Sequence, residues 1–207
     1  FAQIWFHNEF LLIDGKKMSK SLENFFTIDD VVKKGVEPMA LRLLFLQTHY
    51  RKQMNFTWES AKAAREAYSK LEHHVMALKS PTQRTSLSQE KLSTVDELRK
   101  QFFDALDNDL QTPQAIAVMW EVIKSNIPSQ DKLDLVLEFD QVLGLKLNEI
   151  QDEIIPIEIQ ELVNQREAAR QNKDFDKSDH LRKQIESAGY LIEDHSSGAL
   201  VKKAYSK

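Results

Sequence analysis

The sequence contains no cysteine, only five glycines and five prolines in 207 residues, and no apolar run of the ~20 residues that a membrane-spanning helix needs. Without cysteine the chain forms no disulfide bond and no thiolate zinc site, and it is compatible with a reducing compartment. Few glycines, prolines and β-branched runs favour a mainly helical fold. The content of 42% hydrophobic and 29% charged residues argues against intrinsic disorder.

The first residues include neither an initiator methionine nor a basic stretch before an apolar one. We therefore expect that they are not a signal peptide and that the chain is a piece of a longer protein. The aromatic residues Trp5, Phe6 and Phe10 are expected to lie in the core. His7 and Glu9 lack a cysteine or a second well-spaced ligand nearby, so we predict no metal site here.

The net charge of −4 is unevenly distributed along the chain. Residues 14–52 contain eight Lys/Arg against five Asp/Glu, and residues 160–207 contain nine against eight. Residues 53–159 contain eleven against eighteen. The basic groups therefore lie towards the two ends, an arrangement compatible with contacts to a polyanion at two separate places.

A loop rich in lysine and serine follows a short apolar run. Residues 10–13 predict a short strand that ends in an Asp14-Gly15 turn. The loop reads Gly15-Lys16-Lys17-Met18-Ser19-Lys20-Ser21-Leu22-Glu23-Asn24. The ammonium groups of Lys17 and Lys20 can follow phosphate oxygens during a reaction and stabilise charge that grows in the transition state. From residue types alone, a solvated loop is the simpler interpretation.

Two short helices are predicted after this loop. The first has Thr27 at its N-cap and ends at Gly35, and the second begins at Pro38 and is apolar on nearly all sides. The polar and aromatic residues 49–56 follow without periodicity and predict a connecting loop. Arg51 and Lys52 within it are alternatively contacts for an RNA backbone.

Four amphipathic helices are predicted between residues 57 and 150, which together indicate an antiparallel helical bundle. Three of them span about residues 58–78, 89–106 and 130–143, and the remaining one begins at Thr112. Asp107 and Asp109 are interpreted as acids that cap a helix junction rather than as a metal pair, because no histidine or third carboxylate joins them.

A small α+β domain is predicted after Pro156. It contains helices over about 157–172 and 175–188 and a hairpin near the end of the chain. Phe175 belongs to the apolar stripe of the second helix, so we predict that it lies in the core. Basic residues recur on the polar faces of these helices and indicate either a solvated face with ion pairs or a set that faces RNA. These are Arg166, Arg170, Lys173, Lys177 and Arg182.

In their order and spacing, these residues resemble the cysteinyl-tRNA synthetases, a family of class I aminoacyl-tRNA synthetases. The Lys-Met-Ser-Lys-Ser string is the class I signature, whereas the His-Tyr-Arg segment and the tail narrow the resemblance to the cysteine enzyme. The matching residues are Trp5-Phe6-His7, Lys17 to Ser21, Asn24 to Thr27, His49-Tyr50-Arg51, Asn55, Asp107-Asn108-Asp109, Thr112-Pro113, Arg166, Arg170, Lys173-Asp174-Phe175, Asp179, Arg182, Gly189, Glu193-Asp194 and Gly198.

The resemblance implies ATP-dependent attachment of cysteine to its tRNA. It implies that Lys17 and Lys20 are catalytic, and that ATP, with Mg²⁺, is bound by these lysines together with Met18, Ser19 and Ser21. It further implies that the tRNA for cysteine is a partner. The residues implied in tRNA binding are Arg51, Lys52, Arg166, Arg170, Asp179 and Asp194.

By the same resemblance, residues 1–56 would end a catalytic domain and contact the tRNA stem, residues 57–150 would form the bundle, and residues 156–207 would read the anticodon. Zinc is expected in a preceding part of the protein and not in this chain. We expect a cytoplasmic monomer that makes no membrane contact, and we expect this chain alone to be unable to form cysteinyl adenylate.

Some positions depart from the family pattern. Glu9 and Glu23 occur where the family usually has glycine, and Ala199, Leu200 and Val201 follow Gly198 where the family often has threonine and an aromatic residue. Two other functions are compatible with the sequence. One is a non-catalytic helical module that binds tRNA. The other is a related cysteine-activating ligase that acts on a small amine.

Overall fold

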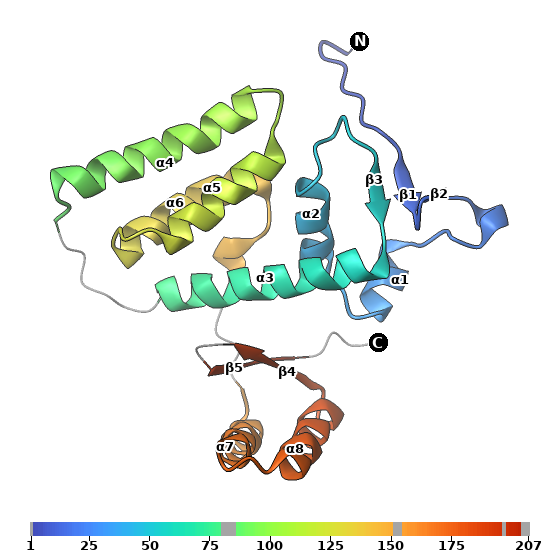
Figure 1. The fold of residues 1–207 in the computed structure, drawn as a ribbon, viewed down its shortest axis with the longest axis vertical. Helices are drawn as coiled ribbons and strands as arrows, with labels where there is room; N and C mark the ends of the chain where they lie inside the picture. Colours follow the sequence, from blue (N-terminus) through green and yellow to red (C-terminus); the bar gives the residue numbers. More distant parts are fainter. Residues whose placement is uncertain (1, 80–85, 151–154, 196–197, 204–207) are drawn as a thin grey trace. The chain divides into compact units, whose positions relative to one another are not determined.

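The computed structural model describes residues 2–79, 86–150, 155–195 and 198–203 (Figure 1). The chain divides into two compact units, residues 1–150 and residues 151–207, each of which has its own hydrophobic core. Helices dominate both units, which confirms the predicted mainly α fold. None of the helices in the described ranges is both long enough and apolar enough to cross a membrane.

The first unit begins with a small sheet in the order β2-β1-β3. β1 pairs with β2 in antiparallel fashion and with β3 in parallel, in the register Leu11↔Met54 and Ile13↔Phe56. Residues 54–56 are therefore a strand, and the prediction of a loop throughout residues 49–56 is wrong for them. The strands are β1 (Leu11–Ile13), β2 (Lys16–Lys17) and β3 (Met54–Phe56).

Two short helices connect β2 to β3. The first, α1, starts with a capping box in which the Thr27 hydroxyl accepts from the Asp30 amide and the Asp30 carboxylate accepts from the Thr27 amide. Pro38 occupies the first turn of α2. Proline has no backbone N–H to donate, and this is tolerated in the first turn because those N–H groups have no intrahelical partner. Both starts confirm the sequence prediction. The helices are α1 (Ile28–Lys33) and α2 (Pro38–Leu46).

The rest of the first unit is a helical bundle in which α5 packs against α4 and α6, and α3 packs against α2 and α6 (Figure 1). The rings of Phe102 and Phe139 stack at 3.8 Å between centroids, and both are fully buried. Such large apolar groups dominate core stability. The helices are α3 (Trp58–Lys79), α4 (Gln89–Asp107), α5 (Thr112–Lys124) and α6 (Ser129–Leu143).

A tight corner ends α6. Gly144 has φ +63° and caps the helix, and Arg42 donates from Nε to the Leu143 carbonyl at 2.6 Å. The buried Asp140 carboxylate accepts from the amides of Leu145 and Leu147 at 2.6 and 2.7 Å. The Arg42 bond satisfies a carbonyl that the end of α6 leaves without an intrahelical partner, and the Asp140 bonds satisfy two amides of the residues that follow the helix.

The aromatic residues at the start of the chain are exposed, which contradicts the prediction that they lie in the core. Trp5 is 68%, Phe6 57% and Phe10 73% exposed. These residues form no helix or strand. One hydrogen bond that connects the segment to the rest of the unit runs from the Glu9 amide to the Tyr50 carbonyl, at 2.9 Å. Apolar side chains on an extended segment with few neighbours cannot all be buried.

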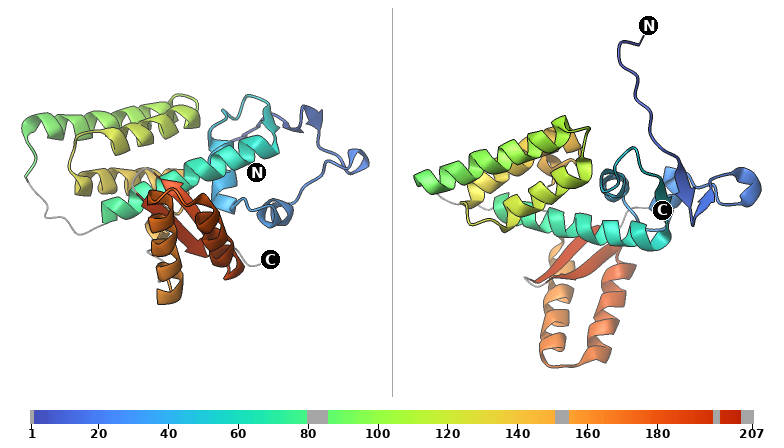
Figure 2. Two further views of the ribbon diagram at one scale, coloured as in Figure 1. Left: turned by 60° about the horizontal axis from the view of Figure 1, so that its bottom comes forward. Right: turned by 45° about the horizontal axis from the view of Figure 1, so that its top comes forward.

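The second unit is a helical hairpin followed by a two-stranded antiparallel hairpin, as predicted (Figure 2). Its small core contains Ile159, Val163, Ile185 and Ile192. Phe175 lies at the start of α8 and is 64% exposed, so the prediction that it belongs to the core is wrong. The elements are α7 (Ile157–Gln171), α8 (Phe175–Ser187), β4 (Tyr190–His195) and β5 (Gly198–Lys203).

Candidate functional site

The lysine-rich loop starts from a tight turn between β1 and β2. Asp14 and Gly15 have φ values of +48° and +73°, as in the two-residue turns that join antiparallel strands. Two long-range bonds attach this turn to β3. The Asp14 amide donates to the Phe56 carbonyl at 3.0 Å, and the Gly15 amide donates to Asn55 Oδ1 at 2.7 Å. The base of the loop is therefore fixed to the sheet.

Asn24 closes the loop on itself. Its Nδ2 donates to the Lys17 carbonyl at 3.1 Å, and its Oδ1 accepts from the Ser19 amide at 2.9 Å. The Ser19 hydroxyl accepts from the Leu22 amide at 3.2 Å and lies 2.9 Å from the Ser21 hydroxyl. The Asn24 side chain thus bonds the backbone at both Lys17 and Ser19. These bonds give the segment from Lys17 to Asn24 a defined backbone conformation.

The predicted ATP residues occupy this closed loop. Lys17, Lys20 and Ser21 are exposed, whereas Ser19 is half-buried. The Lys20 ammonium lies 5.6 Å from the centroid of the Phe25 ring. Met18 is half-buried and packs against the core of the first unit. The backbone therefore directs two ammonium groups to solvent while a methionine anchors the centre of the loop.

Glu23 ends the short 3₁₀ turn η1 (Lys20–Leu22) in the left-handed region, with φ +52° and ψ +22°. Only glycine adopts this conformation without a steric penalty from Cβ. The structure therefore gives a physical reason why glycine suits this position, and it shows that glutamate still supports the same turn.

A second set of contacts joins the segment after α2 to the corner between α4 and α5. Tyr50 donates from its hydroxyl to Asp109 Oδ1 at 2.5 Å, and Arg51 donates to both Asp109 oxygens at 2.7 and 3.0 Å. The His49 imidazole Nε2 lies 2.8 Å from the Asp109 carbonyl oxygen. We call these four residues the Asp109 latch. Interpreting Asp109 as a helix-capping acid was wrong.

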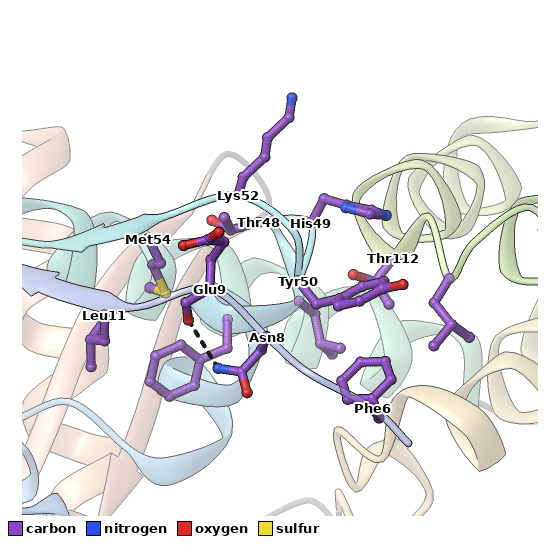
Figure 3. A pocket seen from close by; sticks show the side chains of 13 residues that line it. Phe6, Asn8, Glu9, Leu11, Thr48, His49, Tyr50, Lys52, Met54 and Thr112 are labelled. Carbon is purple, nitrogen blue, oxygen red and sulfur yellow. Dashed lines mark hydrogen bonds between the residues drawn. The ribbon is translucent and has the colours of Figure 1, made fainter. Parts of the chain in front are cut away.

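The latch perturbs the ionisation of its members. Bonds from Arg51 and then from Tyr50 lower the pKa of Asp109 to about 2, and the Asp109 carboxylate raises the pKa of Tyr50. Arg51, a predicted tRNA residue, is therefore engaged with a carboxylate. The neighbouring predicted residue, Lys52, is exposed, and its side chain extends away from the protein in Figure 3.

A pocket of about 450 Å³ lies beside the latch (Figure 3). Phe6 and Tyr50 form part of its wall, with their ring centroids 4.4 Å apart. Leu11 and Met54, from paired strands, and Thr112 also line it. The surface of the pocket is mainly apolar. Lys52, a predicted tRNA residue, is also among the residues that line it.

The remaining predicted residues lie in the second unit, where three arginines surround one carboxylate. Arg166 donates from Nη1 and Nη2 to the two oxygens of Asp194 at 2.8 and 2.9 Å, and Arg170 donates to Oδ2 of the same group. Arg182 Nη2 lies 3.5 Å from Oδ2 and donates to the Ile192 carbonyl at 3.3 Å. Asp179 is exposed on α8. We call Asp194 and its three arginines the Asp194 cluster.

Burial distinguishes Arg166 from the predicted solvated face with ion pairs. The Arg166 side chain is only 2% exposed, whereas those of Arg170 and Arg182 are 44% and 39% exposed. The bond from Arg166, with further contributions from Arg166 and Arg170 charges, lowers the pKa of Asp194 to about 2. The same bond raises the pKa of Arg166.

The sequence analysis assigned no role to Asn24, and it predicted Arg51 as a tRNA residue without its contacts to Asp109. An asparagine after a serine-rich loop signals a side chain that bonds nearby backbone, so Asn24 was detectable in principle. The latch was not detectable locally, because Arg51 and Asp109 are 58 positions apart. In the described ranges, no group of three or more His, Cys, Asp or Glu side chains is arranged as a metal site.

Comparisons with known proteins identify a matching family and several similar proteins. The family described as "tRNA synthetases class I (C) catalytic domain" matches residues 1–66, which include the whole lysine-rich loop. The cysteine–tRNA ligase of Chlamydia felis is 40% identical over 98% of this chain. The cysteine–tRNA ligases of Anoxybacillus flavithermus and Leptospira interrogans are 37% and 32% identical over 96%.

The chain spans 45% of the length of each of these relatives. The family match covers the lysine-rich loop, and the similarity to the ligases continues through the bundle and the Asp194 cluster. The chain therefore belongs to the cysteinyl-tRNA synthetase family.

Proposed function

We propose that this chain acts within a cysteine–tRNA ligase, to which it supplies one ATP-binding loop and a surface for the tRNA. The substrates of that ligase are ATP with Mg²⁺, cysteine and the tRNA for cysteine. The observation that carries the proposal is the closed loop from Lys17 to Asn24. It exposes two ammonium groups on a backbone fixed by Asn24 and by the sheet.

The geometry of this loop suits phosphoryl chemistry. When cysteine attacks the α-phosphorus of ATP, negative charge grows on the departing pyrophosphate. Exposed ammonium groups on a defined backbone stabilise that charge more strongly in the transition state than in the ground state. Lys20, at the start of η1, and Lys17, at the end of β2, supply these groups. Mg²⁺ would accompany the phosphates and neutralise further charge there.

The tRNA surface is proposed for the second unit and for the segment that carries Lys52. The Asp194 cluster contains three guanidinium groups and one carboxylate, and the nearby charges of Asp179 and Glu167 also act on Arg166. Guanidinium groups can both stack on bases and donate to their edges. We propose that this cluster contacts the anticodon, that Asp179 contributes an acceptor there, and that Lys52 contacts the tRNA backbone.

The catalytic part of the proposal is tested by cysteine-dependent exchange between ATP and pyrophosphate in the complete ligase that contains this chain. Lys17→Ala and Lys20→Ala are each expected to lower kcat by roughly 10²-fold, the loss typical of removing one preorganised group that stabilises transition-state charge. Lys33→Ala is the matched control, because Lys33 is an exposed lysine in α1 outside the loop. Equal activity of all three variants would refute the role of the loop.

Two further measurements separate the alternatives. The 207-residue chain alone is expected to give no exchange, because it spans less than half of its relatives. If the complete protein also gives none but the chain binds tRNA, a non-catalytic binding module is the correct function. If the complete protein activates cysteine but does not bind tRNA, a ligase that acts on a small amine is the correct function. We propose that the active form is a cytoplasmic monomer.

A further inference from the structure

We propose that Asp109 is a positioning residue for cysteine activation. Through the Asp109 latch it fixes the base of the lysine-rich loop, and it thereby places the ammonium groups of Lys17 and Lys20. This inference rests on the proposed ATP-binding role of that loop. It gives Arg51 a different role from the predicted contact with tRNA.

The contacts of the latch converge on Asp109. Its carboxylate accepts from the Tyr50 hydroxyl and from Arg51 Nε and Nη2, the fork of donors that would otherwise suit a phosphate. The Arg51 amide donates to Nδ1 of the His49 imidazole at 3.3 Å. His49 is therefore the tautomer with its proton on Nε2, and it donates from this atom to the Asp109 carbonyl at 2.8 Å. Asp109 thus holds three consecutive residues of the segment that follows α2.

The backbone at Asp109 has an unfavourable conformation. Asp109 and Leu110 have φ values of +56° and +51°, and a residue with a Cβ carries a steric cost in this left-handed region. Such conformations persist only where surrounding contacts hold them, and they are concentrated at functional sites. The latch supplies contacts of this kind, because it engages both the side chain and the carbonyl of Asp109.

The segment that Asp109 holds runs directly into β3 (Figure 1). The Lys52 amide closes a turn by donating to the His49 carbonyl at 2.8 Å, and β3 follows this turn. β3 then accepts the two bonds from the Asp14-Gly15 turn that fix the base of the lysine-rich loop. A displacement of residues 49–51 would therefore reach that turn through a short run of backbone.

Tyr50 also holds the strand that leads into the loop. The Glu9 amide donates to the Tyr50 carbonyl at 2.9 Å, and β1 begins shortly afterwards at Leu11. β1 and β3 pair in parallel, so both strands beneath the loop are connected to a segment that Asp109 holds. A misplacement of about 1 Å at a reacting centre can cost roughly 10²-fold in rate even when its cause is distant. The rigidity of this base therefore matters for the reaction at ATP.

The experiment measures cysteine-dependent exchange between ATP and pyrophosphate in the complete ligase that contains this chain, with kcat and the KM for ATP determined separately. Asp109→Asn removes the charge that pairs with Arg51, and it is expected to lower kcat by roughly 10-fold with little change in KM. Arg51→Lys keeps the charge but loses the forked contact, so it should cause a similar loss. Asp104→Asn should leave kcat unchanged, because Asp104 is an exposed acid in α4 that pairs with Lys100 outside the latch.

A second control separates positioning from a loss of stability. Gly144→Ala alters the end of α6, where glycine has φ +63°, and it leaves the latch intact. It should leave kcat unchanged at a temperature where both variants are folded. Hydrogen exchange of residues 14–24 in the complete ligase, followed by mass spectrometry, should be faster in Asp109→Asn than in the wild type and unchanged in Gly144→Ala.

A combined variant shows whether Asp109 acts through the two lysines. In the Lys17→Ala/Lys20→Ala background, Asp109→Asn should cost much less than in the wild type, because the groups that it places are gone. Equal losses in the two backgrounds would overturn the inference, as would equal kcat values for Asp109→Asn and Asp104→Asn. If the lysine variants are slow and Asp109→Asn is not, only this inference fails. If the lysine variants are fully active, the proposed function of the loop fails, and this inference fails with it.

Discussion

Replacing Gly144 by alanine is expected to destabilise the first unit through two separable effects. Gly144 caps α6 with φ +63°, in the left-handed region that favours glycine. A Cβ added there would lie 3.0 Å from Arg42 Nη2 and 3.3 Å from Arg42 Cζ and Nε. The same Arg42 donates from Nε to the Leu143 carbonyl at 2.6 Å. The new methyl group therefore meets the guanidinium that stabilises the helix end.

The two effects have similar sizes. Placing a residue with a Cβ in the left-handed region destabilises the folded state by roughly 1–2 kcal/mol. Alanine also lowers the conformational entropy of the unfolded chain, which stabilises the folded state by about 0.4–1 kcal/mol. Displacing Arg42 from the Leu143 carbonyl costs about 0.5–1.5 kcal/mol more. Gly144→Ala should therefore lower the free energy of unfolding by roughly 0.5–3 kcal/mol.

Urea unfolding followed by tryptophan fluorescence is the appropriate assay. All three tryptophans, at positions 5, 58 and 120, belong to the first unit, so the signal reports that unit alone. Arg42→Ala removes both the hydrogen bond and the steric contact. In that background Gly144→Ala should cost only the conformational part, which is at most about 1.6 kcal/mol.

Two outcomes would refute this reasoning. An equal cost of Gly144→Ala with and without Arg42 would show that the contact with the guanidinium has no energetic effect. A neutral or stabilising effect of Gly144→Ala would show that the left-handed conformation is not maintained in solution.

Three further predictions concern the other clusters. Asp109→Asn removes the carboxylate that raises the pKa of Tyr50, so in an ultraviolet titration one tyrosine should ionise at lower pH, and Tyr50→Phe should abolish that change. Because the pKa of Asp194 is lowered to about 2 in the folded state, its contribution to stability is complete above the unfolded value near 3.8 and disappears as the pH falls towards 2. That contribution is about 1 kcal/mol after allowance for solvent screening. The Asp194→Asn variant should lack it, which acid unfolding followed by circular dichroism would measure. In thermal unfolding, Phe175→Ala should change stability by less than about 0.5 kcal/mol because the ring is exposed, whereas the buried Ile185→Ala should cost about 2–5 kcal/mol.

Local signals in the sequence predicted most of the helices. The Thr27 N-cap and Pro38 at the start of α2 each act through the backbone of their own neighbours, and both were found where predicted. The apolar periodicity of α3 and α4 likewise reports the face that each helix buries. These features need no knowledge of distant residues.

The features that sequence reasoning predicted wrongly depend on distant partners. The three residues of β3 are too few to show a period, and they form a strand because β1 offers a parallel edge. Arg166 recurs at helical spacing like a solvated cation, yet Asp194, 28 positions later, allows it to be buried. Phe175 follows the apolar stripe of α8, but it lies in the first turn, beyond the small core of the second unit.

The parallel pairing of β1 with β3 also sets the order in which the chain can fold. Gly15 and Asn55 are 40 positions apart, and both α1 and α2 lie between them. On a ribosome that adds ~5–20 residues per second, the lysine-rich loop would wait about 2–8 s for its docking partner. Local helices form within microseconds, whereas contacts at this separation must first overcome loop-closure entropy. The loop is thus translated before its docking partner and becomes ordered only after it, so mutations in the loop should change the unfolding rate more than the folding rate.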